Sequence, residues 1–187
     1  MWNCLYSLHG HNNAFNHCCE VCRKLTSCLM STNNTNLAGE FYAMHVLFRI
    51  GLVPALTLGN TKGVDILLFN PQNEKQFKVE VKTTTNTWVN EKNFGGRNIN
   101  WRMSQKHETE FDEDLIYCFV QVPRDLSHHP RVFFIKSKEV ADYVKWQHAH
   151  WLHNVPHKKA VKDTDMRTFR ILEGDMERYE NNYKVFE

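Results

Sequence analysis

The sequence lacks a long apolar run, a secretory signal and a strong charge of either sign. No stretch of its 187 residues approaches the roughly 20 consecutive apolar residues that cross a bilayer. The first 29 residues have neither the basic start nor the continuous apolar centre of a signal peptide. These absences argue against a membrane partner and predict an intracellular, cytoplasmic protein.

The formal net charge is only +2, with 23 Lys and Arg against 21 Asp and Glu. This balance does not by itself indicate a nucleic-acid partner, although 11 histidines add positive charge below neutral pH. Apolar residues make up 42% and charged residues 24% of the chain, as in an ordinary globular protein. The length suits one domain with a sizeable core.

Cysteine is almost absent after residue 28, since Cys118 is the only cysteine in the rest of the sequence. Near the start, Cys19-Glu20-Val21-Cys22 is a C-x-x-C with histidines close by, which suits tetrahedral zinc. No second, well-spaced ligand pair follows, so we do not expect zinc here. Disulfides are not expected in a reducing compartment.

The first 35 residues are better explained as an extension. Met30 is followed by the polar run 31–36, which resembles a natural chain start. Residues 1–29 are then a dispensable extension, or an upstream stretch included by an early start codon. We expect residues 1–35 to be flexible or dispensable and residues 36–187 to form the domain.

From Asn36 onward the hydrophobic pattern becomes regular. Apolar residues recur at helical spacing, with Asn36 as N-cap and Gly51 as the C-terminal residue. Pro54 favours a strand start or an edge strand. The polar stretch 83–100 predicts a mobile loop. The other expected elements are strands at 52–58, 62–69, 77–82, 115–122, 131–135 and 169–172, and helices at 101–110 and 138–151. This order predicts an α/β sheet flanked by helices.

Two of these strands carry acids that a strand does not need. Asp65 lies in the first, and Glu80 and Lys82 share one face of the second because strand side chains alternate. A short turn at 71–75 folds the second strand beside the first, so Asp65 and Glu80 can converge. Two carboxylates and an ammonium suit the binding of a hard divalent cation and the steering of water toward a phosphate.

The chain resembles the PD-(D/E)XK nuclease superfamily over roughly residues 36 to 136. Asp65 matches the first motif acid, and Glu80-Val81-Lys82 matches E-x-K. Glu40, in a helix that precedes them, matches the glutamate that faces the site in many members. Val64 stands where the name-giving proline would be. An E-x-K by itself is common on solvated strands, so the resemblance rests on all three motifs in the correct order.

The resemblance implies a restriction-endonuclease-like fold with a central mixed five-stranded sheet flanked by helices. It also implies Mg²⁺, with Mn²⁺ as a substitute, held by Asp65, Glu80 and the Val81 carbonyl. Glu40 would bind a second metal or orient waters. Lys82 would position the nucleophilic water and stabilise developing charge.

Four further residues are weaker candidates. In many members a helix after E-x-K brings a glutamine or lysine to the site, which would be Gln105 or Lys106 here. The alternative is an exposed amphipathic helix. Arg97 and Arg102 are interleaved with aromatic residues, which suits phosphate contacts and base stacking. The alternative is a surface loop with aromatic anchors in the core.

Three functions follow from these patterns. The leading one is a metal-dependent endonuclease that hydrolyses phosphodiester bonds in DNA, with a homodimer as one way to cut both strands. The second is a nucleic-acid-binding protein of the same fold with weak or no cleavage. The third is a protein-interaction role in which the N-terminal Cys/His segment binds zinc.

Overall fold

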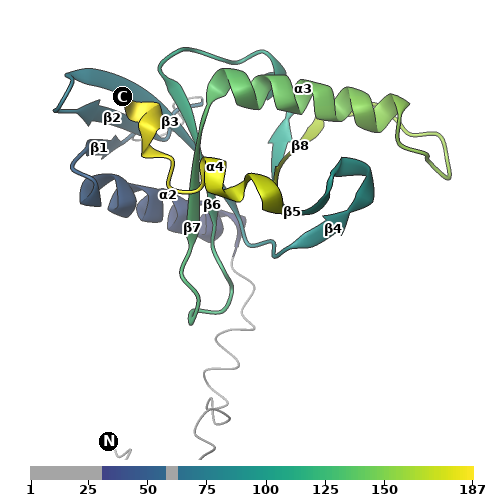
Figure 1. Cartoon of the computed structure of the whole chain (residues 1–187), viewed down its shortest axis with the longest axis horizontal. Helices are drawn as coiled ribbons and strands as arrows, with labels where there is room; N and C mark the ends of the chain where they lie inside the picture. Colours follow the sequence, from purple (N-terminus) through teal and green to yellow (C-terminus); the bar gives the residue numbers. More distant parts are fainter. Residues whose placement is uncertain (1–30, 58–62) are drawn as a thin grey trace, which may run out of the picture.

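The computed structural model describes residues 31–57 and 63–187, which form two β-sheets and two long helices (Figure 1). The expected Cys/His segment, and most of the expected turn at 59–63, lie outside these residues. The helices are α2 (Thr32–Arg49), α3 (Ser137–His153) and α4 (Met176–Tyr179), and short 3-10 helices are η1 (Lys92–Phe94), η2 (Gln105–Glu108), η3 (Glu173–Asp175) and η4 (Tyr183–Phe186). The strands are β1 (Val53–Leu56), β2 (Ile66–Asn70), β3 (Lys75–Thr84), β4 (Val89–Glu91), β5 (Gly96–Ser104), β6 (Leu115–Gln121), β7 (Arg131–Lys136) and β8 (Met166–Leu172).

The central sheet has five strands in the order β1-β2-β3-β6-β7. The β3–β6 pair is parallel and the other pairs are antiparallel, so the sheet is mixed. The strand that contains Pro54 lies at the sheet edge, as its missing N–H group favours. The fold is therefore the predicted α/β arrangement with flanking helices.

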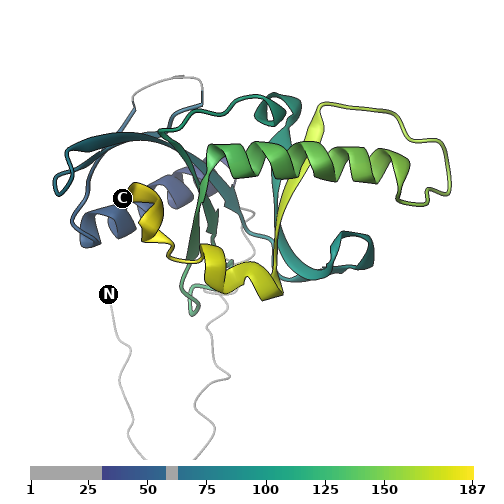
Figure 2. The ribbon, with the colours of Figure 1, turned by 45° about the horizontal axis from the view of Figure 1, so that its top comes forward.

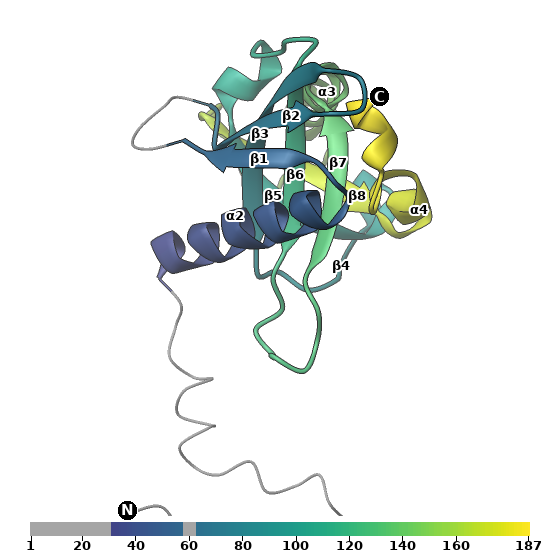
Figure 3. The ribbon, with the colours of Figure 1, turned by 90° about the vertical axis from the view of Figure 1, so that its left-hand side faces the viewer.

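The two faces of the central sheet carry separate cores. On β6, whose residues are all buried, Ile116, Cys118 and Val120 join the core under α2. The intervening Tyr117 and Phe119 join the core on the opposite face, under α3 and the second sheet. This alternation is the two-residue period of a strand buried on both sides. Figure 3 shows α2 in front of the central strands and α3 behind them.

The second sheet, with order β4-β5-β8, corrects two predictions. The stretch 83–100 is not a loop, since β3 extends to Thr84 and β4 and most of β5 follow. Residues 101–104 continue β5, and the expected helix is reduced to η2. On β5 the apolar residues Ile99, Trp101 and Met103 are buried, and polar residues alternate with them. Because polar residues occupy every second position of β5, the sequence pattern did not reveal this strand.

The helix α2 begins earlier than predicted. Ser31, not Asn36, is the N-cap, and its hydroxyl accepts a hydrogen bond of 3.2 Å from the Asn34 N–H group. At the other end Gly51 has a φ of 85°, the left-handed conformation that favours glycine. Within the described part of the chain, no helix combines the length and the apolar character needed to cross a bilayer.

Candidate active site

An open cleft of about 780 Å³ brings together the three predicted acids. Glu40 reaches it from α2, Asp65 from the residue before β2, and Glu80 from the middle of β3. Lys82 and Val81 line the same cleft. Residues from three separate elements therefore converge, as the sequence motifs predicted.

Asp65 is fixed by the backbone of the neighbouring strand. The Val81 N–H group donates a hydrogen bond of 2.7 Å to the Asp65 Oδ2 atom. Burial raises the pKa of the Asp65 carboxyl, and the nearby Glu80 charge adds to that effect. The Val81 N–H group and the Lys82 ammonium offset part of it. The Asp65 carboxylate is thus fixed in position, and the nearby donor and positive charge offset only part of the effect of its burial.

Glu80 is almost completely buried, at 3% exposed, yet it has three positive or donor partners, which are Lys82, His107 and, at 3.9 Å, Lys106. The Lys82 Nζ atom lies 2.6 Å from the Glu80 Oε1 atom, and the His107 Nε2 atom lies 3.2 Å from the same oxygen. Burial alone would raise the pKa of Glu80, but His107 and Lys82 outweigh it and lower that pKa to about 2. Glu80 is therefore ionised at every physiological pH.

The His107 imidazole is itself held by Ser104. The Ser104 N–H group donates to the His107 Nδ1 atom at 3.1 Å, which leaves the Nε2–H to donate to Glu80. Beside Glu80 on β6 lies the buried Tyr117 hydroxyl, whose pKa is raised by burial and by the Glu80 charge. The Tyr117 hydroxyl beside Glu80 therefore keeps its proton.

Glu40 reaches the cleft because α2 packs closely on β3. A Cβ atom added at Gly39 would overlap the Thr83 Oγ1 atom, so only glycine permits this approach. Burial raises the pKa of Glu40, and the Asp65 charge adds to it. The negative charges of Glu40 and Asp65 therefore repel each other across the cleft, and a cation bound between them would be stabilised.

The donor set fits a hard divalent cation of the Mg²⁺ type. Carboxylate oxygens are the ligands it prefers, and it uses only one or two of them with waters and substrate phosphates. Across the described ranges, no three His, Cys, Asp or Glu side chains stand close enough together to enclose a metal. The cleft thus offers an open carboxylate edge, with Asp65 flanked by Glu40 and Glu80.

Basic and hydroxyl groups line the remaining walls. Arg102 on β5 and Lys106 on η2 lie on one side, as two of the weaker predictions required. Arg124, in the loop after β6, also lines the cleft, and so do Thr32 and Thr35 from the first turn of α2. The cleft therefore presents donors that suit an anionic ligand around its acids.

Two of the weaker candidates lie elsewhere. Gln105 lines a separate hollow of about 480 Å³ beside η2. Arg97 is bound to Glu173 at 2.7 Å and stacks over the Trp88 ring, 4.7 Å from its centroid. The structure therefore brings Arg102 and Lys106 to the acids but not Gln105 or Arg97.

Sequence reasoning missed His107 and Arg124. The signal for His107 is the Ser104 to His107 capping arrangement, in which each residue bonds the backbone of the other. Because a helix was predicted over 101–110, Ser104 was not considered as the residue that caps a short helix at 105. For Arg124 the sequence holds no local signal, because only the β6–β7 connection brings it to the cleft.

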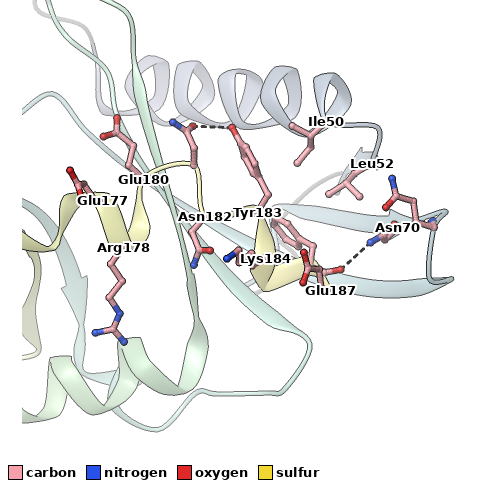
Figure 4. A pocket seen from close by; sticks show the side chains of 13 residues that line it. Ile50, Leu52, Asn70, Glu177, Arg178, Glu180, Asn182, Tyr183, Lys184 and Glu187 are labelled. Carbon is pink, nitrogen blue, oxygen red and sulfur yellow. Dashed lines mark hydrogen bonds between the residues drawn. The ribbon is translucent and has the colours of Figure 1, made fainter.

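Another hollow, of about 680 Å³, lies beside the C-terminal residues (Figure 4). The side chains of Glu177, Arg178 and Lys184 diverge from one another there. The Asn70 side chain donates to the Phe186 carbonyl at 3.0 Å, which fixes η4 against β2. This hollow is explained by packing of the C-terminal segment.

Comparison with known proteins supports the fold. No protein-family model and no curated protein sequence matches the chain. A solved structure, that of the bacterial homing endonuclease I-Ssp6803I, matches with a TM-score of 0.50 at 13% identity. The match covers 83% of this chain and 91% of that protein. At this identity the similarity shows a nuclease-like fold.

Proposed function

We propose that the protein is a metal-dependent DNA endonuclease of the PD-(D/E)XK type, with Mg²⁺ as its cofactor and Mn²⁺ as a substitute. The observation that carries this proposal is the convergence of Glu40, Asp65, Glu80 and Lys82 in one cleft with basic walls. Similarity to the fold of a homing endonuclease adds support. A DNA substrate also fits the cytoplasmic location expected from the sequence.

The residues of the cleft have distinct roles in this proposal. Asp65 and Glu80, with the Val81 carbonyl, would hold the cation, and Glu40 would orient a second cation or waters. When bound, such a cation lowers the pKa of a coordinated water and neutralises phosphate charge. The Lys82 ammonium, 2.6 Å from Glu80, lies where it can orient water and stabilise negative charge developing on the phosphate.

The test is cleavage of plasmid, branched and single-stranded DNA with Mg²⁺ or Mn²⁺. We expect Asp65→Asn and Lys82→Ala each to lower the cleavage rate by about 10²–10³-fold or more, because each removes charge next to the reacting phosphate. The matched controls are Asp142→Asn and Lys138→Ala, from an exposed ion pair on α3. Equal cleavage by the site and control variants would disprove the assignment.

A second function, nucleic-acid binding with weak or no cleavage, is favoured by one observation. The Glu80 Oε1 atom is already occupied by Lys82 and His107, so it is less available to a metal. Retarded DNA without cleavage, in the presence of either metal, would select this function. The zinc-dependent interaction role rests on residues outside the described part of the chain.

A further inference from the structure

The segment that joins α3 to β8, residues 154–165, carries a group of exposed lysines, and its last residue lies against η2. Lys158, Lys159 and Lys162 are all exposed, and none of them has a carboxylate within 4 Å among the described residues. Figure 2 shows this connection leaving the far end of α3 and returning across the molecule to β8. We call these three residues the lysine group.

Hydrogen bonds tie this segment to the body of the protein near both of its ends. The His157 Nε2 atom lies 2.7 Å from the Trp151 carbonyl oxygen, at the end of α3. The Asp163 carboxylate lies 2.7 Å from the Nε2 atom of the buried His148. The Gln105 N–H group donates to the Asp165 carbonyl at 2.8 Å. The lysine group therefore sits on an anchored segment whose last residue lies against η2.

Helix η2 connects the segment to the cleft. Lys106 of η2 lines the cleft that holds the acids, and it also lines the 480 Å³ hollow beside η2. Asp165 and Gln105 form other parts of that hollow. A surface path thus runs from the acids, past Lys106 and over the hollow, to the segment with the lysine group.

The charge along this path indicates what it binds. Asp163 lies beside His148 and Glu108 pairs with the buried Arg167, whereas the exposed Asp165 has no ion pair among the described residues. The segment therefore presents three lysines against one unpaired acid. Unpaired lysines that follow a basic cleft suit the phosphate backbone of a nucleic acid, which contacts Lys and Arg without regard to sequence. A sequence-independent contact with the phosphate backbone is therefore the chemistry that these lysines suit.

We infer that the lysine group binds the phosphate backbone of duplex DNA outside the cut site, as a continuation of the cleft. This inference rests on the proposed DNA function and adds to it a second contact surface. Its role is affinity, because the lysine group does not line the cleft. It would hold the duplex that extends from the active site over η2.

The test is the salt dependence of duplex binding by the full chain without divalent cation, followed by fluorescence anisotropy. We expect the variant Lys158→Ala/Lys159→Ala/Lys162→Ala to reduce the slope of log K against log salt concentration by about 2–3, since each neutralised phosphate contributes roughly 0.9. The control variant Lys136→Ala/Lys145→Ala/Lys184→Ala removes exposed lysines outside the cleft and the η2 hollow, and should leave the slope unchanged.

Duplex length provides a second readout. A duplex of about 8 base pairs spans under 30 Å at roughly 3.4 Å per pair. We expect it to occupy the cleft without contacting the lysine group, and therefore to bind the wild type and the variant equally. A duplex of about 24 base pairs should bind the wild type more tightly than the variant. With Mg²⁺ and saturating long DNA, the cleavage rate of the two proteins should agree.

The outcomes separate the two proposals. If the wild type binds long duplex DNA and the variant has the same salt slope, the inference is wrong and the proposed function stands. If the control variant loses as much slope as the test variant, the contact is a general charge effect and the inference is also wrong. If the wild type binds no DNA at any salt concentration, both proposals fail.

Discussion

At the scale of single residues, the site combines carboxylates in opposite electrostatic states. Glu80 is ionised and fully compensated, whereas burial raises the pKa of Glu40 and Asp65. When the pKa of a carboxyl is higher in the folded state than in the unfolded state, the free energy of unfolding of the protein falls as the pH rises through the folded value. At neutral pH Asp65 and Glu40 therefore destabilise the fold, which is the expected cost of a site built to receive a cation.

From this we predict that Asp65→Asn and Glu40→Gln raise the melting temperature at pH 7 while they abolish cleavage. In Asp65→Asn the amide oxygen would still accept the hydrogen bond from the Val81 N–H group, so only the charge is lost. Added Mg²⁺ should raise the melting temperature of the wild type but not that of Asp65→Asn. Thermal denaturation with and without Mg²⁺ measures both effects. A lower melting temperature in both variants at pH 7 would contradict the sign of the argument.

The His107 hydrogen bond gives a second prediction. The pKa of Glu80 is about 2 in the folded chain against an ordinary value of 4.5. Its contribution, roughly 3 kcal/mol, is therefore fully present above about pH 4.5 and is lost as the pH falls toward 2. His107→Leu should cost about 1.5–3 kcal/mol at pH 7, because a buried charge loses a donor.

Acid unfolding followed by circular dichroism checks this prediction. In His107→Leu the pKa of Glu80 rises, so the acid midpoint should move to higher pH. His107→Gln, which retains a donor, should restore part of both the stability and the cleavage rate. If Leu and Gln behave alike, His107 acts through packing and not through its hydrogen bond.

At the scale of elements, the contact of α2 with β3 decides where Glu40 lies. Gly39, Ala43 and Leu47 form the buried stripe of the helix, and Gly39 meets Thr83 at the C-terminal end of β3. A helix kept farther from the strand would withdraw Glu40 from the cleft. The close approach at one glycine thus links packing to the candidate chemistry.

We predict that Gly39→Ala lowers the cleavage rate although alanine favours helices by about 1 kcal/mol over glycine. The double variant Gly39→Ala/Thr83→Ala should recover part of the rate, because it removes the two closest atoms of Thr83. Gly174→Ala is the matched control, since a Cβ there meets no atom within 4 Å. Cleavage rates and melting temperatures of the three variants test this prediction. An unchanged cleavage rate in Gly39→Ala would show that the close contact of α2 with β3 does not control the site.

At the scale of the whole molecule, the cleft lies where elements of both sheets meet. The central sheet provides Glu80 and Lys82, the second sheet provides Arg102, and η2 at the end of β5 provides Lys106 and His107. The two cores on opposite faces of β6 and β7 hold these parts together. The site therefore depends on the complete domain.

The domain boundary leads to a prediction at this scale. Since Ser31 caps α2, a chain that starts at Ser31 keeps the first helix cap. We expect removal of residues 1–30 to leave the melting temperature and the cleavage rate unchanged. Metal analysis of both proteins tests the zinc alternative, because stoichiometric zinc that disappears with residues 1–30 would support it. A large loss of stability would show that the extension belongs to the domain.

The sequence alone specified the order of the acids, the strand that carries Glu80 and Lys82, and an α/β sheet flanked by helices. These features are local, because strand alternation and helix periodicity depend on neighbouring residues. The second sheet was predicted only in its last strand. The alternation of polar Asn98, Asn100 and Arg102 with apolar residues crosses the boundary placed near residue 100, so β5 was divided between a loop and a helix.

Only the tertiary structure decided which groups meet at the acids. The buried His107 reaches Glu80 from η2, and Arg124 reaches the cleft from the β6–β7 loop, whereas Gln105 and Arg97 face other surfaces. Such contacts join residues far apart in the chain, for example 27 positions between Glu80 and His107. They depend on how sheets and helices pack, which no local pattern of side chains encodes.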